Sequence, residues 1–98
     1  MMTFEENLEA QGYTSLRKLT DGRLIGLLQF NFTWGLVVGL NEAGYDFRYC
    51  YEHLQDAARD VEIWSGTGDP AGPWIKQKGQ GIDRLNPAIA HLHIGEPT

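Results

Sequence analysis

The sequence predicts an α+β fold: a four-stranded antiparallel meander, with a short N-terminal helix and a longer second helix packed on one face of the sheet. Two segments have helical periodicity, residues 4–11 and 52–64, and four strand-like runs lie between them. Short turn sequences join these runs, which favours antiparallel neighbours because parallel strands need long crossover connections. A chain of 98 residues is sufficient for one hydrophobic core. We therefore expect a single domain over residues 1–98, in which the last segment, residues 82–98, either holds a brief strand or turn or, over 83–98, forms a loosely ordered tail.

The first helix is predicted from its N-terminal signal. Thr3-Phe4-Glu5-Glu6 has the pattern of a capping box, in which the Thr3 hydroxyl and the Glu6 carboxylate satisfy backbone amides reciprocally. Phe4 and Leu8 are four residues apart and are expected to face the core. Gly12 is a natural C-terminal stop, so the helix should cover residues 4–11.

Alternation of apolar and polar residues predicts the four strands. The segment Tyr45–Tyr51 shows it best: its tyrosines and Phe47 share one face, while Arg48 and Cys50 share the other. The strands are expected to be linked through Asp21-Gly22, through Thr33-Trp34-Gly35, and through the turn 41–44. With both helices on one face, Ile25, Leu27 and Val37 should tend toward the opposite face, to be covered by the tail or by a partner. The four predicted strands are Tyr13–Leu19, Arg23–Phe32, Leu36–Leu40 and Tyr45–Tyr51.

The second helix, Glu52–Trp64, has an apolar arc about 120° wide, as expected for a helix that packs on a core. The arc consists of Leu54, Ala57, Ala58, Val61 and Trp64. A Gly/Pro-rich segment follows, from Gly66 to Gly81, and we interpret it as a stiff surface loop anchored by Trp74 near Trp64. It leaves a helix instead of opening one and has no Gly-Lys-Ser/Thr, so it is not a phosphate-binding loop of a known type. Lys76 and Lys78 remain candidates for holding an anion.

Composition narrows the function classes. The chain has thirteen acidic and eight basic residues, a formal charge of −5, which argues against direct binding to nucleic acid. Its one cysteine excludes an intrachain disulfide. The apolar stretch 24–40 is short for a membrane span and is interrupted by polar residues, and the N-terminus lacks the pattern of a signal peptide. These features predict a cytoplasmic protein that does not enter a membrane.

The candidates for chemistry are weak. His91 and His93, with Glu96, could ligate a metal, but structural zinc sites commonly bring two ligand pairs. Cys50 and His53 could form a nucleophile and its base, but no orienting residue stands at a recognisable spacing, and a core or sheet-face cysteine is the simpler interpretation. The sequence therefore predicts no catalytic residue, no metal site and no cofactor.

The acidic residues give a sharper pattern. Glu52, Asp56 and Asp60 follow one another at steps of four residues, about 6 Å along a helix axis. Such a row could imitate the phosphates of a nucleic acid strand and occupy a basic groove. The alternative is an ordinary solvated helix face. The predicted partner-binding set is Glu5, Glu6, Glu9, Glu52, Asp56, Asp60, Glu62 and Ile63.

Three blocks carry a resemblance: "GRLIGLLQFNFTWGLVVGL", "FRYCYE" and "GTGDPAGPWIKQKG". Across residues 12–79 the chain resembles a group of short proteins encoded by phages and prophages. In size, acidity and lack of a reaction centre it is also similar to anti-CRISPR inhibitors, several of which occupy the DNA-binding surface of a CRISPR surveillance complex. This second resemblance is one of class and assigns no residue a role.

Taken together, these features predict a non-enzymatic phage-type inhibitor. It would bind the basic surface of a nucleic-acid-binding complex, such as a CRISPR effector, through its acidic helix faces and so block DNA binding. One alternative is a small ligand-binding or enzymatic domain that uses Tyr45, Tyr49 and Tyr51 under the Gly-rich loop. Another is a homo-oligomeric structural module, for instance a homodimer.

Overall fold

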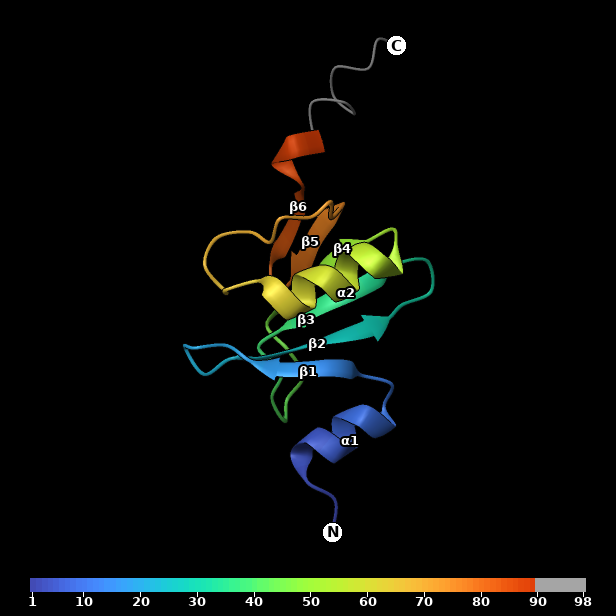
Figure 1. The fold of residues 1–98 in the computed structure, drawn as a ribbon, viewed down its shortest axis with the longest axis vertical. Coiled ribbons are helices and arrows are strands. Elements are labelled where there is room, and N and C mark those ends of the chain that lie inside the picture. Colours follow the sequence, from blue (N-terminus) through green and yellow to red (C-terminus); the bar gives the residue numbers. More distant parts are fainter. Residues whose placement is uncertain (90–98) are drawn as a thin grey trace.

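A computed structural model describes residues 1–89 of the chain, which form two helices, a short helical segment at 87–89 and a six-stranded sheet (Figure 1). Every strand pairs with its neighbours in the sequence, so the strand order is β1-β2-β3-β4-β5-β6 and all pairs are antiparallel. Helix α2 is inserted between β4 and β5. In chain order the elements are α1 (Phe4–Ala10), β1 (Thr14–Lys18), β2 (Leu24–Gln29), β3 (Trp34–Val38), β4 (Phe47–Tyr51), α2 (Leu54–Ile63), β5 (Lys76–Gly79) and β6 (Ile82–Leu85).

The α+β class and the antiparallel meander are confirmed, but the sheet has two more strands than the four that the sequence predicts. The hairpin β5–β6 lies in residues expected to be a loop, followed by a brief strand or a tail. Its strands are only four residues long. They form because β5 pairs with the edge of β4, with Tyr49 opposite Gln77 and Phe47 opposite Gly79. Pairing of this kind depends on residues almost thirty positions away, which a local pattern does not reveal.

The turns are partly as expected. The turn after β1 and the bridge between Asn41 and Gly44 are confirmed. The β2–β3 turn lies earlier than predicted: the Phe30 amide donates to the Thr33 carbonyl at 2.8 Å, and Trp34 already belongs to β3.

The main core lies between the sheet and α2. Leu36 and Tyr51 from the sheet are almost fully buried, as are Ala57 and Val61 from the helix. Trp64 and Trp74 both contact Tyr49 edge-on, with ring centroids 5.7 and 4.8 Å apart. The apolar arc of α2 is confirmed except at its start. Leu54 remains 42% exposed. The buried members are Leu19, Ile25, Leu27, Leu36, Val38, Tyr49, Tyr51, Ala57, Val61, Trp64 and Trp74.

A second, smaller core lies on the other face of the sheet. Val37 and Tyr13 are buried there together with Leu8, which comes from α1. The expectation that both helices pack on one face is therefore wrong, because α1 and α2 contribute to different clusters. Ile25 and Leu27 lie beneath α2, with exposed fractions of 0% and 4%.

A homodimer that pairs through Ile25, Leu27 and Val37 would have no exposed surface to use. The second core buries Val37, and α2 buries Ile25 and Leu27.

Arginines from the first hairpin hold the C-terminal end of α2. Arg17 donates through Nε to the Val61 carbonyl at 2.8 Å and through its guanidinium to the Trp64 carbonyl. Arg23 donates to the Gly66 carbonyl at 2.7 Å. The last turn of α2 has no basic residue of its own. Cations beside the free carbonyls of a helix end are favourable, so these contacts fix the position of α2 on the sheet.

The Gly/Pro-rich segment before β5 is an ordered cover over the sheet. Trp74, which is 2% exposed, donates from its indole nitrogen to the Pro70 carbonyl at 3.3 Å. Asp69 accepts hydrogen bonds from the Tyr49 hydroxyl at 3.0 Å and from Arg84 at 2.6 Å. The predicted anchoring role of Trp74 is confirmed. The two lysines of the segment, Lys76 and Lys78, lie within β5 and not at the end of a loop.

Candidate functional site

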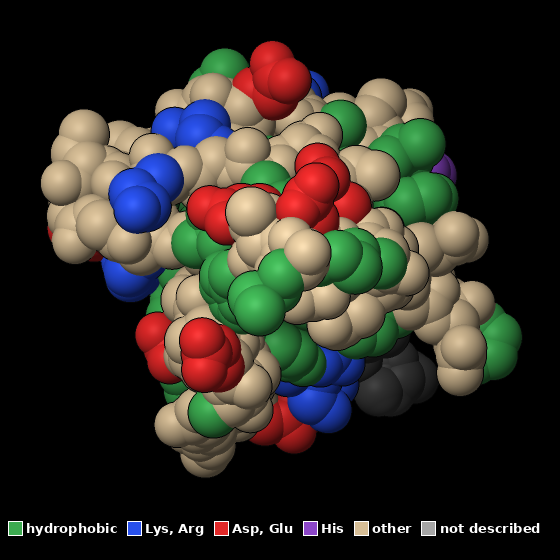
Figure 2. All heavy atoms as spheres, turned by 90° about the horizontal axis from the view of Figure 1, so that it is seen from below, with side chains coloured by type: hydrophobic (Ala, Val, Ile, Leu, Met, Phe, Trp, Pro, Cys, Tyr) green, Lys and Arg blue, Asp and Glu red, His purple; other side chains and the backbone are tan. Residues whose placement is uncertain are grey.

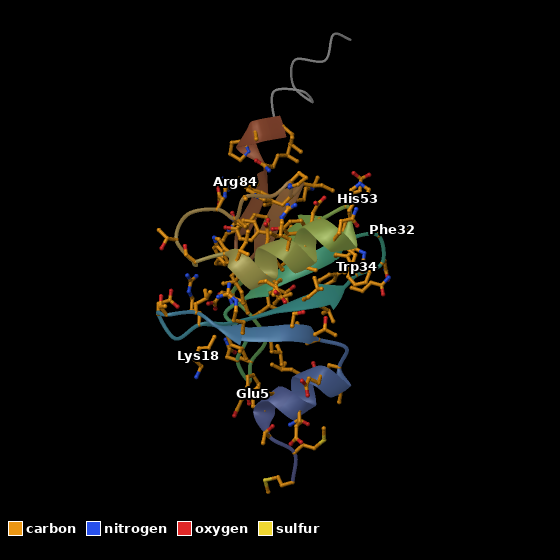
Figure 3. All side chains as sticks on the ribbon, viewed as in Figure 1. Glu5, Lys18, Phe32, Trp34, His53 and Arg84 are labelled. Carbon is orange, nitrogen blue, oxygen red and sulfur yellow. The ribbon has the colours of Figure 1, made fainter. Side chains whose placement is uncertain are left out.

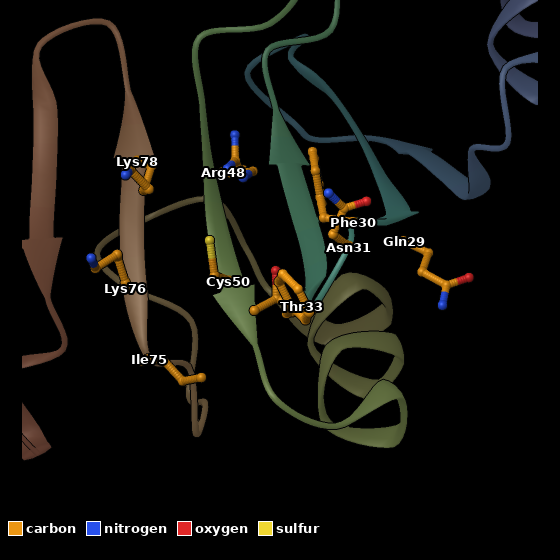
Figure 4. Close-up of a pocket in the computed structure, with 10 residues that line it drawn as sticks. Gln29, Phe30, Asn31, Thr33, Arg48, Cys50, Ile75, Lys76 and Lys78 are labelled. Atoms are coloured by element: carbon orange, nitrogen blue, oxygen red, sulfur yellow. The ribbon is translucent and has the colours of Figure 1, made fainter.

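A groove of about 500 Å³ lies on the face of the sheet opposite α2 (Figure 4). Its floor is formed by β4 and β5, and the β2–β3 turn forms its other side. Alternation along the strands places Arg48 and Cys50 of β4, and Lys76 and Lys78 of β5, on this face. We call it the cationic groove. Its lining residues are Gln29, Phe30, Asn31, Phe32, Thr33, Arg48, Cys50, Ile75, Lys76 and Lys78.

The groove is positively charged in a chain whose formal charge is −5. Among the described residues, ten line the groove, of which three are cations and none is acidic. In the register of β4 and β5, Arg48 stands directly opposite Lys78. Like charges at directly opposed positions of an antiparallel pair are unfavourable. A bound anion would relieve that repulsion.

Arg48 is positioned by contacts that do not neutralise its charge. Its guanidinium carbon lies 4.2 Å from the centre of the Phe30 ring, and one terminal nitrogen donates to the Tyr45 hydroxyl at 2.6 Å. Its Nε is buried without a hydrogen-bond partner among the described residues. Stacking on an aromatic ring keeps the planar guanidinium in one orientation. Arg48 is thus a fixed charge on the groove floor.

The two lysines differ in their surroundings. Lys76 has its ammonium nitrogen 3.7 Å from the exposed carboxylate of Asp83 on β6. Within residues 1–89, no carboxylate oxygen lies within 4.0 Å of the Lys78 nitrogen. Exposed ion pairs of the Lys76–Asp83 kind contribute little and exchange readily. Both lysines are therefore accessible to an anion in the groove.

The tyrosine-rich face of β4 is not a ligand site. Tyr49 and Tyr51 are 2% and 0% exposed beneath α2 and the Gly/Pro-rich segment. Burial, reinforced by a hydrogen bond to Asp69, raises the pKa of Tyr49 above its ordinary value of 10.0. Burial and a hydrogen bond to Asp60 do the same to the pKa of Tyr51. The expected ligand site under the loop is therefore filled by the core, and the groove lies on the reverse face.

Asp60 overturns the predicted acidic row. Its side chain is fully buried, and its Oδ2 accepts hydrogen bonds from the Tyr51 hydroxyl and the Gly72 amide, each at 2.7 Å. Asp56 is only partly exposed and lies 3.5 Å from Arg59. A row Glu52–Asp56–Asp60 therefore does not face solvent. On a helical wheel Asp60 lies near the margin of the apolar arc. Its partner Gly72 belongs to the Gly/Pro-rich segment that follows α2.

The other members of the predicted partner-binding set are exposed but dispersed. Glu5 is on α1, whereas Glu52 immediately precedes His53, the N-cap of α2; Figure 3 shows Glu5 and His53 far apart. Glu62 and Ile63 close the last turn of α2. Seen from the α1 end, acidic side chains form separate groups divided by apolar and polar surface (Figure 2). The exposed members are Glu5, Glu6, Glu9, Glu52, Glu62 and Ile63.

The candidate nucleophile–base pair and the candidate metal ligands do not form a site among the described residues. Cys50 is buried on the groove face of the sheet, the sheet-face position that the sequence allows, while His53 is exposed at the start of α2. Within residues 1–89, no group of three His, Cys, Asp or Glu side chains is arranged to hold a metal ion. His91, His93 and Glu96 lie outside the described residues. In the described part of the chain, no helix has the length and apolarity needed to cross a bilayer.

Comparisons with protein-family models, with curated proteins and with solved structures gave no match. The site is therefore interpreted from its own residues.

Sequence reasoning singled out Lys76 and Lys78 but missed the groove. Their spacing of two residues is a strand signal, and Arg48 alternates with the tyrosines of β4 in the same way. The two patterns combine only when β5 is known to pair with β4, because that pairing brings Arg48 and Lys78 together.

Proposed function

We propose that this chain is a non-enzymatic binding protein that holds a small anionic ligand in the cationic groove. The observation that supports the proposal is the pair of Arg48 and Lys78 on the adjacent strands β4 and β5, for which residues 1–89 supply no acidic residue in the groove lining. This is the ligand-binding class that the sequence left open, moved to the other face of the sheet.

Size and charge define the ligand. A groove of about 500 Å³ is within the range of small-molecule sites, about 300–1,000 Å³. Phosphate oxygens match ammonium and guanidinium donors, which hydrogen-bond them strongly. A long polyanion would also meet the repulsion of a chain with a net charge of −5. The groove therefore suits a compact phosphate-bearing molecule.

Titration calorimetry with inorganic pyrophosphate at low salt tests this function. Replacing both lysines, K76A/K78A, should weaken binding at least about tenfold, because each charge-assisted hydrogen bond contributes about 1.5–3 kcal/mol. The control is Lys18→Ala with Arg84→Ala, which also removes two positive charges, from β1 and β6 and outside the groove lining. Equal affinity of K76A/K78A and wild type would refute the proposal. So would no saturable binding at about 1 mM ligand, an affinity of about −4 kcal/mol.

A second candidate is the phage-type inhibitor that occupies the basic surface of a nucleic-acid-binding complex. The specific observation in its favour is α1, where Glu5, Glu6 and Glu9 are all exposed and no basic residue lies in the helix. Since α1 and α2 belong to different clusters, this interface would use one helix at a time. It would not use a continuous acidic row.

The inhibitor function is tested by pull-down on purified CRISPR effector complexes. The charge reversals Glu5→Lys and Glu9→Lys leave the capping pair of Thr3 and Glu6 intact. They should abolish capture if α1 is the interface, whereas Glu52→Lys with Glu62→Lys tests α2 separately. Reversing Asp60 is unsuitable, because it would bury a cation. Capture of an effector that survives all four reversals would exclude both helix faces.

A further inference from the structure

One exposed aromatic residue stands beside the cationic groove. Phe32, at the tip of the β2–β3 turn, is 93% exposed although it lines the groove together with the cations (Figure 3). An exposed phenylalanine gains none of the free energy that burial of its ring would give. The neighbouring Phe30 is already occupied, since Arg48 stacks on its ring. Phe32 therefore has an unoccupied aromatic face next to a phosphate-binding surface.

The same turn supplies polar groups of the kind that read a base edge. Gln29 and Asn31 are exposed, and Thr33 is partly exposed. Side-chain amides offer both donors and acceptors, and the threonine hydroxyl offers both as well. Asn31 and Thr33 lie on the side of the β2–β3 turn, the cations are on β4 and β5, and the Gln29 side chain is directed away from the cations (Figure 4). The groove thus has a cationic side and a side with aromatic and amide groups.

We infer that the groove binds a nucleoside phosphate, a deduction that rests on the proposed anion-binding function. The phosphate contacts Arg48, Lys76 and Lys78. The base stacks on Phe32, and the polar side chains of the turn meet its edge. Every nucleobase has a π-face, so stacking on Phe32 tolerates different bases.

The ligand is a single nucleotide and not a strand. The groove of about 500 Å³ suits one nucleotide. Beyond it the chain is acidic, which opposes the addition of further phosphates. The Debye length of about 8 Å at physiological salt screens one bound phosphate from distant carboxylates, but a strand would pass close to them.

The test compares adenosine 5′-monophosphate with ribose 5-phosphate, which differs from it only in lacking the base. Wild type should bind the nucleotide about tenfold more tightly, because base–aromatic stacking is worth about 5- to 150-fold in affinity. Phe32→Leu should lower nucleotide affinity at least about fivefold, toward that of ribose 5-phosphate, and leave ribose 5-phosphate binding unchanged. Phe32→Trp, which keeps an aromatic face, should retain nucleotide binding. Because Phe32 is exposed, neither substitution should lower the melting temperature.

The outcomes separate this inference from the function on which it rests. Equal affinities for the two ligands, with both lost in K76A/K78A, would overturn the nucleotide and leave the anion site standing. Binding of neither ligand, or binding that K76A/K78A does not weaken, would overturn both. Binding of a short poly-dT strand more tightly than the mononucleotide would overturn the restriction to a single nucleotide.

Discussion

Replacement of Asp60 is the most informative single perturbation of this fold. The carboxylate is fully buried and joins three elements: the Tyr51 hydroxyl of β4, the Gly72 amide of the Gly/Pro-rich segment, and α2 itself. Both hydrogen bonds end on Oδ2. The other oxygen, Oδ1, has no hydrogen-bond partner among the described residues and lies 3.6 Å from Nε of Arg59.

Asp60→Ala leaves two buried donors without an acceptor. Each unsatisfied donor costs about 1–3 kcal/mol, so the two together cost about 2–6 kcal/mol. We expect the free energy of unfolding to fall by about 4 kcal/mol, a large part of the 5–15 kcal/mol available to a domain. At about 4–8 °C per kcal/mol, the melting temperature should fall by about 15–30 °C.

Asp60→Asn is the matched control. Its amide oxygen can take the place of Oδ2 and accept both hydrogen bonds, while its NH₂ group takes the place of the unbonded Oδ1. The charge is lost, and the NH₂ group becomes a buried donor beside Arg59 with no acceptor among the described residues, so we expect a cost of about 2 kcal/mol, smaller than that of Asp60→Ala. Asp56→Ala, one turn earlier on α2, should cost less than about 1 kcal/mol, because its pair with Arg59 is partly exposed.

Urea unfolding followed by tryptophan fluorescence measures all three variants, since Trp64 and Trp74 lie in the main core. The reasoning fails if Asp60→Ala costs less than about 1 kcal/mol, because the two donors would then have found water or other acceptors. It also fails if Asp60→Asn and Asp60→Ala are equally destabilised, since the position of Oδ2 would then not matter.

Three further predictions concern the same core and sheet. The raised pKa values of Tyr49 and Tyr51 mean that the folded state holds these protons more tightly than the unfolded state; the resulting stability is complete below pH 10 and decreases above it. The decrease should approach about 1.4 kcal/mol per pH unit for each tyrosine, and Tyr51→Phe should flatten it in urea titrations at pH 9–11. Trp74→Ala should cost about 3–5 kcal/mol by the same assay, and a change below about 1 kcal/mol would contradict its anchoring role. Gly79→Ala would place a methyl group 2.5 Å from the Asp46 carbonyl oxygen, so hydrogen exchange in β5 should accelerate; unchanged protection would show that the pairing of β4 and β5 accommodates the methyl group.

Much of the local structure could be predicted from the sequence. The capping box of Thr3 and Glu6 is present in both directions, at 2.7 and 3.1 Å. The alternation in β4 places Tyr49 and Tyr51 toward the core and Arg48 on the other face. The apolar arc of α2 is buried at Ala57, Val61 and Trp64. These features depend on groups within a few residues of one another, so the local pattern alone identifies them.

The tertiary structure decided which surfaces are available. In the sequence, Asp60 is an ordinary acidic residue at the margin of a helix face. Only the fold shows that the Gly72 amide donates to its buried carboxylate. The sequence of α1 does not show which face of the sheet the helix covers. That face is decided by the contacts of Leu8 with Tyr13 and Val37 in the second core. Likewise, Arg48 and Lys78 form one charged site because β5 pairs directly with β4, although α2 separates the two strands in the sequence. In each case the deciding contact joins elements from separate parts of the sequence. Its energy depends on packing between those elements, which the pattern of neither segment contains.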